Sequence, residues 1–172
     1  MKIADRIFDT DGRPYIMGIL NVTPDSFSDG GQHNSLASAL AATEEMIGQG
    51  ADIIDVGGES TRPGYTMISD DEEIERTAPI IEVIKKNFDV PVSLDTYKSA
   101  VAEAGIKAGA DLINDIWGLK YDKNMAGVIA KYDKACCIMH NRENTDYTNY
   151  LDDVVADLDE SVKLAFAAGI DR

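Results

Sequence analysis

The chain alternates short apolar stretches, each ending in a polar residue, with segments of helical periodicity, and this alternation constrains its fold more than any other feature. An internal repeat marks it most clearly, because residues 50–55 read Gly-Ala-Asp-Ile-Ile-Asp and residues 109–114 read Gly-Ala-Asp-Leu-Ile-Asn. In each copy a glycine ends a helix, an acidic residue begins a strand and a polar residue ends it. Strands that alternate with helices over short connections form parallel sheets with right-handed crossovers. The sequence therefore predicts an α/β fold.

The apolar runs and their boundaries predict five strands and five helices. The predicted strands are 16–20, 51–56, 90–94, 111–113 and 135–139, and the predicted helices are 35–49, 70–87, 99–108, 123–132 and 150–168. Asn34 or Ser35 is expected to cap the first helix, and Ser69 with Glu72 forms a capping box for the second. Residues 2–15 predict a hairpin that turns at Asp11-Gly12.

Two architectures accommodate this pattern. A closed (β/α)8 barrel needs eight strands and about 250 residues, whereas this chain has 172 residues. A five-stranded doubly wound sheet is the alternative. We favour the barrel, because polar residues end the strands and a barrel turns those ends toward one centre. The predicted fold is a TIM barrel truncated to about five βα units with an N-terminal β-hairpin, and residues 1–172 form a single domain.

Charge and composition exclude several classes of partner. The net charge is -15, from 31 acidic and 16 basic residues, which would repel nucleic acid and anionic membranes. No apolar stretch reaches the 18 residues of a membrane span, and the N-terminus lacks a signal core, so we expect a cytoplasmic protein. The adjacent Cys136 and Cys137 are expected to be buried thiols rather than a strained disulfide.

The candidate site consists of the residues that end the predicted strands. In parallel α/β folds the carboxyl ends of the strands lie on one face, where ligands bind. Carboxylate and amide side chains at neighbouring strand ends can pair with a flat heterocycle that presents donors and acceptors on its edge. The alternative is that each side chain only caps its strand. These residues are Asn21, Asp55, Asp95, Asn114 and Met139.

Two long polar loops follow the first and second strands. Residues 21–31 read Asn-Val-Thr-Pro-Asp-Ser-Phe-Ser-Asp-Gly-Gly, and Asn21 can offer an oxygen atom to a metal ion. Residues 57–64 read Gly-Gly-Glu-Ser-Thr-Arg-Pro-Gly, and Arg62 can contact a phosphate or a carboxylate at two points. The alternative for the first loop is an ordinary capped turn, and the alternative for Arg62 is a loop arginine that contacts only solvent.

These two loops, together with Ser-Leu-Asp-Thr at 93–96 and Asn-Asp-Ile at 114–116, resemble the dihydropteroate synthase family. The resemblance covers the whole chain and implies a TIM barrel. It also implies a transferase of folate biosynthesis and a sulfonamide target. In that reaction the amine of p-aminobenzoate displaces pyrophosphate from 6-hydroxymethyl-7,8-dihydropterin diphosphate, with Mg2+, to give 7,8-dihydropteroate.

The resemblance also implies roles for individual residues. Asn21 would bind Mg2+ beside the pyrophosphate, and Asn21, Arg62 and Asp95 would be catalytic. The pterin diphosphate would contact Asp55, Thr61, Asp95, Asn114, Ile116 and Met139. The p-aminobenzoate pocket would be built by Phe27, Asp29, Arg62 and Pro63.

The family's later strands supply an aspartate, a lysine and an arginine–histidine pair, and this sequence ends before them. We therefore expect an N-terminal part of a dihydropteroate synthase that is inactive alone, and a homodimer for the full-length protein. Two alternatives stay open. One is a pterin-binding methyltransferase domain, and the other is a non-catalytic pterin-binding fragment or paralogue.

Overall fold

The computed structural model describes residues 1–22, 32–60 and 66–171. Within them, five parallel strands pair in the order in which they follow along the chain. The strands span Met17–Asn21 (β3), Ile53–Gly57 (β4), Val92–Asp95 (β5), Leu112–Asp115 (β6) and Ala135–Ile138 (β7). The helices span Gln32–Gly48 (α1), Asp70–Asn87 (α2), Ser99–Ala108 (α3), Met125–Lys131 (α4) and Tyr150–Ala168 (α5). The predicted α/β alternation is confirmed.

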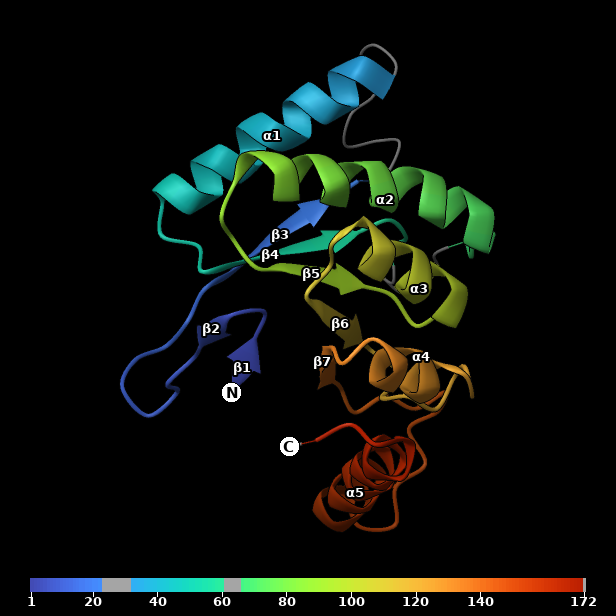
Figure 1. Cartoon of the computed structure of the whole chain (residues 1–172). Helices are drawn as coiled ribbons and strands as arrows, with labels where there is room; N and C mark the ends of the chain where they lie inside the picture. The colour runs from blue at the N-terminus through green and yellow to red at the C-terminus, as the bar shows by residue number, and fades with distance from the viewer. Residues whose placement is uncertain (23–31, 61–65, 172) are drawn as a thin grey trace.

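The strand order and the position of the helices distinguish between the two predicted architectures. Figure 1 shows α1 to α4 along one face of the sheet, and each helix packs against the next one in the chain. In a doubly wound sheet the strand order reverses at a switch point and helices cover both faces. Here the order is sequential and the helices lie on one side, as in a (β/α)8 barrel. The partial TIM barrel is confirmed, and the doubly wound alternative is wrong.

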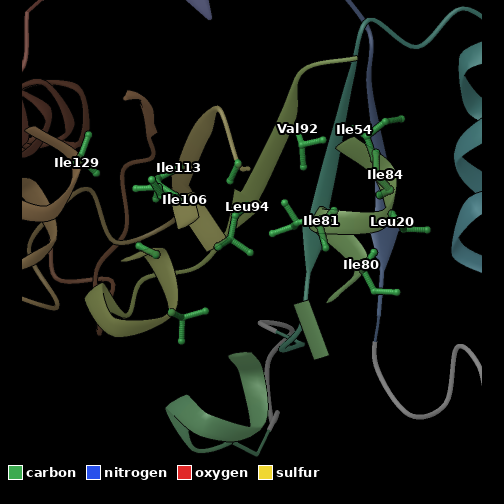
Figure 2. Close-up of a cluster of buried hydrophobic side chains, with 14 of the residues drawn as sticks. Leu20, Ile54, Ile80, Ile81, Ile84, Val92, Leu94, Ile106, Ile113 and Ile129 are labelled. Carbon is green, nitrogen blue, oxygen red and sulfur yellow. The ribbon is translucent and has the colours of Figure 1, made fainter. Parts of the chain in front are cut away.

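The main core lies between the sheet and the helices. Figure 2 shows Ile54, Leu94 and Ile113 from neighbouring strands near Ile81 of α2 and Ile106 of α3. The strand residues Ile54, Leu94 and Ile113 are each 0% exposed. Because successive side chains of a strand point to opposite faces, this apolar row leaves the alternate residues of each strand on the inner face of the sheet.

A second apolar cluster fills the amino end of that inner face. Ile53 and Leu112, near the start of β4 and β6, pack with Ile3 and Phe8 of the N-terminal segment. The Phe8 ring also meets Tyr15 edge-on, with ring centroids 4.8 Å apart. The N-terminal segment therefore closes the amino end of the sheet and leaves the carboxyl ends to the polar residues.

The N-terminal hairpin is present but lies earlier than predicted. Strand β1 (Lys2–Ile3) pairs antiparallel with β2 (Arg6–Ile7), and Ala4 turns the chain with a φ of 52°. The prediction of a hairpin turn at Asp11-Gly12 is wrong. A turn does form there, because the Asp9 side chain accepts a hydrogen bond from the Asp11 amide at 3.2 Å, but it joins no pair of strands.

Local signals at the helix ends are mostly confirmed. Ser69 accepts a hydrogen bond from the Glu72 amide at 3.2 Å and caps α2. Gly109 and Gly169 end α3 and α5 with φ of 117° and 92°, which glycine adopts without strain. The predicted cap of the first helix at Asn34 or Ser35 is wrong, because α1 already begins at Gln32.

The two cysteines are free thiols, as predicted. Cys136 is half-buried against the main core, but Cys137 is exposed, so the prediction that both are buried is wrong. Cys137 pairs with Asn114 in the strand register and lies on the inner face, above the apolar cluster that fills the amino end. None of the helices that the structure describes has the length and hydropathy to cross a bilayer.

Candidate functional site

The strand register places the predicted polar residues in one row at the carboxyl end of the sheet. Asn21 pairs with Gly57, Gly57 with Asp95, and Asp95 with Asn114. Asp55 lies two residues before Gly57 and therefore on the same inner face. Side chains from four strands are thus brought to one surface, although Asn21 and Asn114 are 93 residues apart in the sequence.

Asp55 and Asn114 are joined across the strand between them. The Asn114 amide donates to Asp55 Oδ2 at 3.4 Å, passing over β5. The other oxygen, Asp55 Oδ1, has no partner among the described residues although Asp55 is only 5% exposed. Burial raises the pKa of Asp55, and the side chains of Ser93 and Asn114 oppose that rise. A buried acceptor without a partner is costly, so Asp55 is poised to accept an N–H group from a ligand.

Asp95 is the most perturbed carboxyl group of the row. Burial, reinforced by the negative charges of Asp55, Glu73 and Asp115, raises the pKa of Asp95 to about 7. A carboxyl group that exchanges its proton near neutral pH, beside a second carboxylate, is typical of a functional site. It can donate a hydrogen bond when protonated and accept one when ionised.

Gly57 leaves an open position between the oxygen atoms of two site residues. A methyl group on Gly57 would lie 3.7 Å from Asn21 Oδ1 and 3.8 Å from Asp95 Oδ2. Oxygen atoms of this kind suit Mg2+, which takes few protein ligands and keeps water and substrate phosphates in its shell. The residues therefore fit the predicted ion. No cluster of three or more His, Cys, Asp or Glu side chains among the described residues offers a metal site made by protein alone.

Ile116 and Met139 flank the row and are positioned by Asp115. Ile116 begins the turn after β6, and the buried Asp115 carboxylate holds that turn by accepting from the amides of Trp117 and Leu119, each at 2.8 Å. The Asp115 carbonyl accepts from the Met139 amide at 3.2 Å. Met139 is 45% exposed. The apolar residues after β6 and β7 thus lie beside the polar row and can contact the face of a flat ring.

Five of the predicted site residues lie outside the described residues. They are Phe27, Asp29, Thr61, Arg62 and Pro63. Among the residues that are described, no hydrogen bond or ion pair joins a lysine or arginine to Asp55, Asp95 or Asn114.

Sequence reasoning missed three features of this region. Ser93 pairs with Asp55 in the register and is fully buried, and its hydroxyl opposes the rise that burial causes in the pKa of Asp55. Asp115 follows Asn114 directly. The sequence signal that could have identified it is a second polar residue at the end of an apolar strand, in a position that faces the helices. Lys98 is buried between two glutamates, and nothing in its local sequence indicates this.

Comparisons with known proteins agree with this geometry. The sequence profile of the family described as "Pterin binding enzyme" matches residues 17–172. Among curated relatives, the dihydropteroate synthase of Clostridium beijerinckii is 59% identical over 170 residues, which cover 99% of this chain and 63% of that protein. The dihydropteroate synthase of Bacillus subtilis is 56% identical, over 91% of this chain and 55% of that protein. The chain thus spans less than two thirds of the length of these relatives.

Solved structures give the same result. A dihydropteroate synthase of Clostridium difficile, crystallised in the presence of pteroic acid, superposes with a TM-score of 0.93 at 50% identity, over 96% of this chain and 64% of that one. The dihydropteroate synthase of Yersinia pestis, in a sulfonamide drug complex, superposes with a TM-score of 0.88 at 40% identity, over 99% of this chain and 64% of that one. From the profile match, the barrel order of the strands and the polar row at their carboxyl ends, we conclude that the chain belongs to the pterin binding enzyme family.

Proposed function

We propose that this protein is a dihydropteroate synthase, a transferase of folate biosynthesis. It would join 6-hydroxymethyl-7,8-dihydropterin diphosphate to p-aminobenzoate, giving 7,8-dihydropteroate and pyrophosphate. The observation that carries the proposal is the buried pair of Asp55 and Asn114 beside Asp95, on the inner face of the sheet at the carboxyl ends of the strands. The relatives named dihydropteroate synthase support it, since they match nearly the whole chain.

Asp55 and Asn114 would bind the edge of the pterin ring. Pterins present ring and amino N–H groups beside ring acceptors, and Asp55 Oδ1 is a buried acceptor that lacks a donor among the described residues. A site built around such groups discriminates strongly against ligands that leave them unpaired. Asp95 would accept a further N–H in its ionised form, and Ile116 and Met139 would contact the ring face.

Asn21 and Mg2+ would act at the diphosphate. Asn21 would offer its amide oxygen to the ion beside Asp95. When bound, Mg2+ neutralises the charge that develops on the departing pyrophosphate. Thr61 and Arg62 would add contacts to the same group, and Arg62 with Phe27, Asp29 and Pro63 would hold p-aminobenzoate.

The reaction breaks the bond between the pterin methylene carbon and the diphosphate oxygen. The amine nitrogen of p-aminobenzoate forms the new bond to that carbon and then releases a proton. The part of this chain that the structure describes would contribute orientation: Asp55, Asp95 and Asn114 hold the ring so that its methylene group faces the amine. Positioning of two reactants in this way contributes much of the rate acceleration of such transfers.

Calorimetric titration with the pterin diphosphate, with and without Mg2+, tests the proposal. We expect binding that needs Mg2+, and binding of p-aminobenzoate only after the pterin diphosphate or pyrophosphate is present. Binding of the pterin diphosphate that is indifferent to Mg2+ would instead favour a pterin-binding methyltransferase domain, which has no diphosphate to hold.

We further propose that this chain of 172 residues binds the pterin without turning it over. Arg62 is the one positively charged side chain among the diphosphate contacts proposed above, and the described residues bring no lysine or arginine into contact with Asp55, Asp95 or Asn114. Steady-state formation of dihydropteroate by this polypeptide alone would contradict this proposal.

A further inference from the structure

A network of charged side chains joins helix α5 to the loop that follows β7. Asp157 of α5 accepts hydrogen bonds from Arg142 Nε at 2.6 Å and from Arg142 Nη2 at 3.2 Å, and its Oδ2 lies 2.8 Å from His140 Nε2. The side chains of Asp157, His140 and Arg142 are only 18%, 17% and 24% exposed. One carboxylate of the helix therefore binds two residues of the loop.

The Asp157 carboxylate serves the loop rather than its own helix. Hydrogen bonds from Arg142 and His140 outweigh desolvation and lower the pKa of Asp157 to about 2, so this side chain is ionised and can only accept hydrogen bonds. Asp157 lies seven residues after Tyr150, where α5 begins, which is too far to cap the end of the helix. The hydrogen bonds of its carboxylate all come from the loop.

The loop held in this way has no regular structure of its own. Residues 139–149, all of which the structure describes, form neither helix nor strand. Arg142 also donates to the Asp146 carbonyl at 2.9 Å, and its guanidinium lies 4.5 Å from the centroid of the Tyr147 ring. Asp157 thus connects several loop residues to α5 through one arginine.

Met139, which is proposed above to contact the face of the pterin ring, is the first residue of this loop. Its amide donates to the Asp115 carbonyl of β6 at 3.2 Å. A methyl group on Gly118 would lie 3.0 Å from the Met139 carbonyl oxygen and 2.7 Å from Ser161 Oγ of α5, so the backbone has little room there. The backbone of Met139 therefore lies between β6, the turn that follows β6, and α5.

The side chain of Met139 depends on this backbone for its direction. Successive side chains of a strand point to opposite faces, so Met139 follows Cys137 onto the inner face of the sheet. His140 points the other way, to Asp157 of α5, which packs beside α4 outside the sheet (Figure 1). Met139 is 45% exposed and belongs to neither apolar cluster of the described residues. Core packing therefore does not fix its orientation.

We propose that Asp157 is a positioning residue, which through His140 and Arg142 holds Met139 in place beside the pterin ring. The proposal rests on the proposed function, because it is there that Met139 contacts the ring. Asp157 itself would touch no ligand. Its loss would leave Met139 with more orientations, and binding of the ring would then have to select one of them, which costs affinity.

Asp157→Asn in the chain of 172 residues tests this by two measurements that need no turnover. The variant keeps the size of the side chain but removes its charge and turns a donor toward Arg142 and His140. The first measurement is hydrogen exchange of the Met139 amide without ligand, which we expect to accelerate at least about tenfold. The second is the calorimetric Kd for 6-hydroxymethylpterin, which we expect to rise about three- to tenfold.

A double-mutant cycle shows whether Asp157 acts through Met139. In a Met139→Ala background, Asp157→Asn should change the Kd by less than about twofold, because the side chain that Asp157 positions is absent. A merely structural role would weaken binding by the same factor in both backgrounds.

Asp159→Asn is the matched control. Asp159 is an aspartate of the same helix, but it pairs with Lys163 within α5 at 2.5 Å, and the two side chains are 56% and 74% exposed. This variant should change neither Met139 exchange nor the Kd by more than about twofold. Arg142→Gln is the second variant if Asp157→Asn does not fold. It should shift both measurements in the same direction by a smaller factor, because the contact of Asp157 with His140 remains.

The outcomes separate this proposal from the proposed function. Unchanged Met139 exchange would overturn the positioning role, and so would an unchanged Kd or an equal loss of affinity in the two backgrounds. If exchange accelerates but the wild-type chain binds no pterin, Asp157 holds the loop as inferred and the proposed function is wrong. Accelerated exchange, with a loss of affinity only where Met139 is present, supports both.

Discussion

Asn114 reaches over a whole strand to donate a hydrogen bond to Asp55, at 3.4 Å. The two residues lie on β6 and β4, with β5 between them. Strands two positions apart in a sheet are about 9.6 Å apart, so the two side chains must lean toward each other over β5 to meet. The contact joins separate strand ends into one site, in which Asp55 Oδ1 is buried and makes no hydrogen bond to the described residues.

Asp55→Asn should remove ligand binding and leave the fold intact or more stable. Burial raises the pKa of Asp55, so its ionised form opposes folding at neutral pH, and we expect a gain on the order of 1 kcal/mol in the free energy of unfolding. Pterin affinity should fall at least about tenfold, because the amide presents a donor where the ring needs an acceptor. Urea unfolding and calorimetry measure the two effects.

Asp111→Asn is the control for this variant. Asp111 is equally buried, at 7% exposure, but it is paired with Lys85 at the amino end of β6. Removing its charge leaves the lysine without its partner, so stability should fall by about 1–3 kcal/mol while pterin affinity stays unchanged. A loss of pterin binding in this control would show that the Asp55 effect is not specific to the site.

The pH dependence of stability should carry the signature of Asp95. Its folded pKa of about 7 lies above the ordinary value of 3.8, so the unfolded chain releases its proton first as the pH rises. The contribution of Asp95 to stability is therefore greatest below pH 4, falls between pH 4 and 7, and levels off above 7. The full loss is on the order of 2–4 kcal/mol. Urea unfolding of wild type and Asp95→Asn at about pH 5 and pH 8 isolates this loss, and an identical pH dependence in both proteins would contradict it.

Asn21→Ala should remove the metal dependence of diphosphate binding. The Asn21 amide oxygen is the predicted protein ligand of Mg2+, near Asp95 Oδ2 across Gly57. We expect Mg2+ to tighten binding of the pterin diphosphate at least about tenfold in the wild-type protein and less than about threefold in the variant. Binding of 6-hydroxymethylpterin, which has no diphosphate, should be equal in both. Calorimetric titrations with and without EDTA give these ratios, and full retention of the Mg2+ effect would exclude Asn21 as the ligand.

Two helical glycines should respond to alanine in opposite directions. A methyl group on Gly105 of α3 would lie 2.2 Å from Leu94 Cδ2 in the core, so Gly105→Ala should cost about 1–3 kcal/mol through overpacking. Gly127 of α4 has open space around the same position, and Gly127→Ala should stabilise by about 0.5–1 kcal/mol through helix propensity. Thermal and urea unfolding compare the pair. A stabilised Gly105→Ala would show that α3 can move away from β5.

Much of the fold could be predicted because its signals are local. Ser69 caps α2 through an amide three residues away, and Gly109 and Gly169 end their helices by their own backbone conformation. Strand ends could be located to within one or two residues because apolar runs stop where polar residues begin. The N-terminal hairpin is present, but its predicted turn was wrong: Asp11-Gly12 carries a local turn signal, whereas strand pairing placed the hairpin turn at Ala4.

The site could be predicted only as a set of candidates. Alternation placed Asp55, Asp95 and Asn114 at strand ends, and the resemblance to a family supplied their roles. The sequence by itself determined the elements, their order and the polar ends, because hydrogen bonds and side-chain periodicity within a few residues control them. Tertiary structure alone decided the raised pKa of Asp95, the contact of Asn114 with Asp55 and the burial of Lys98. Each depends on groups from different strands and helices, and no local pattern encodes how closely they approach or how much water they exclude.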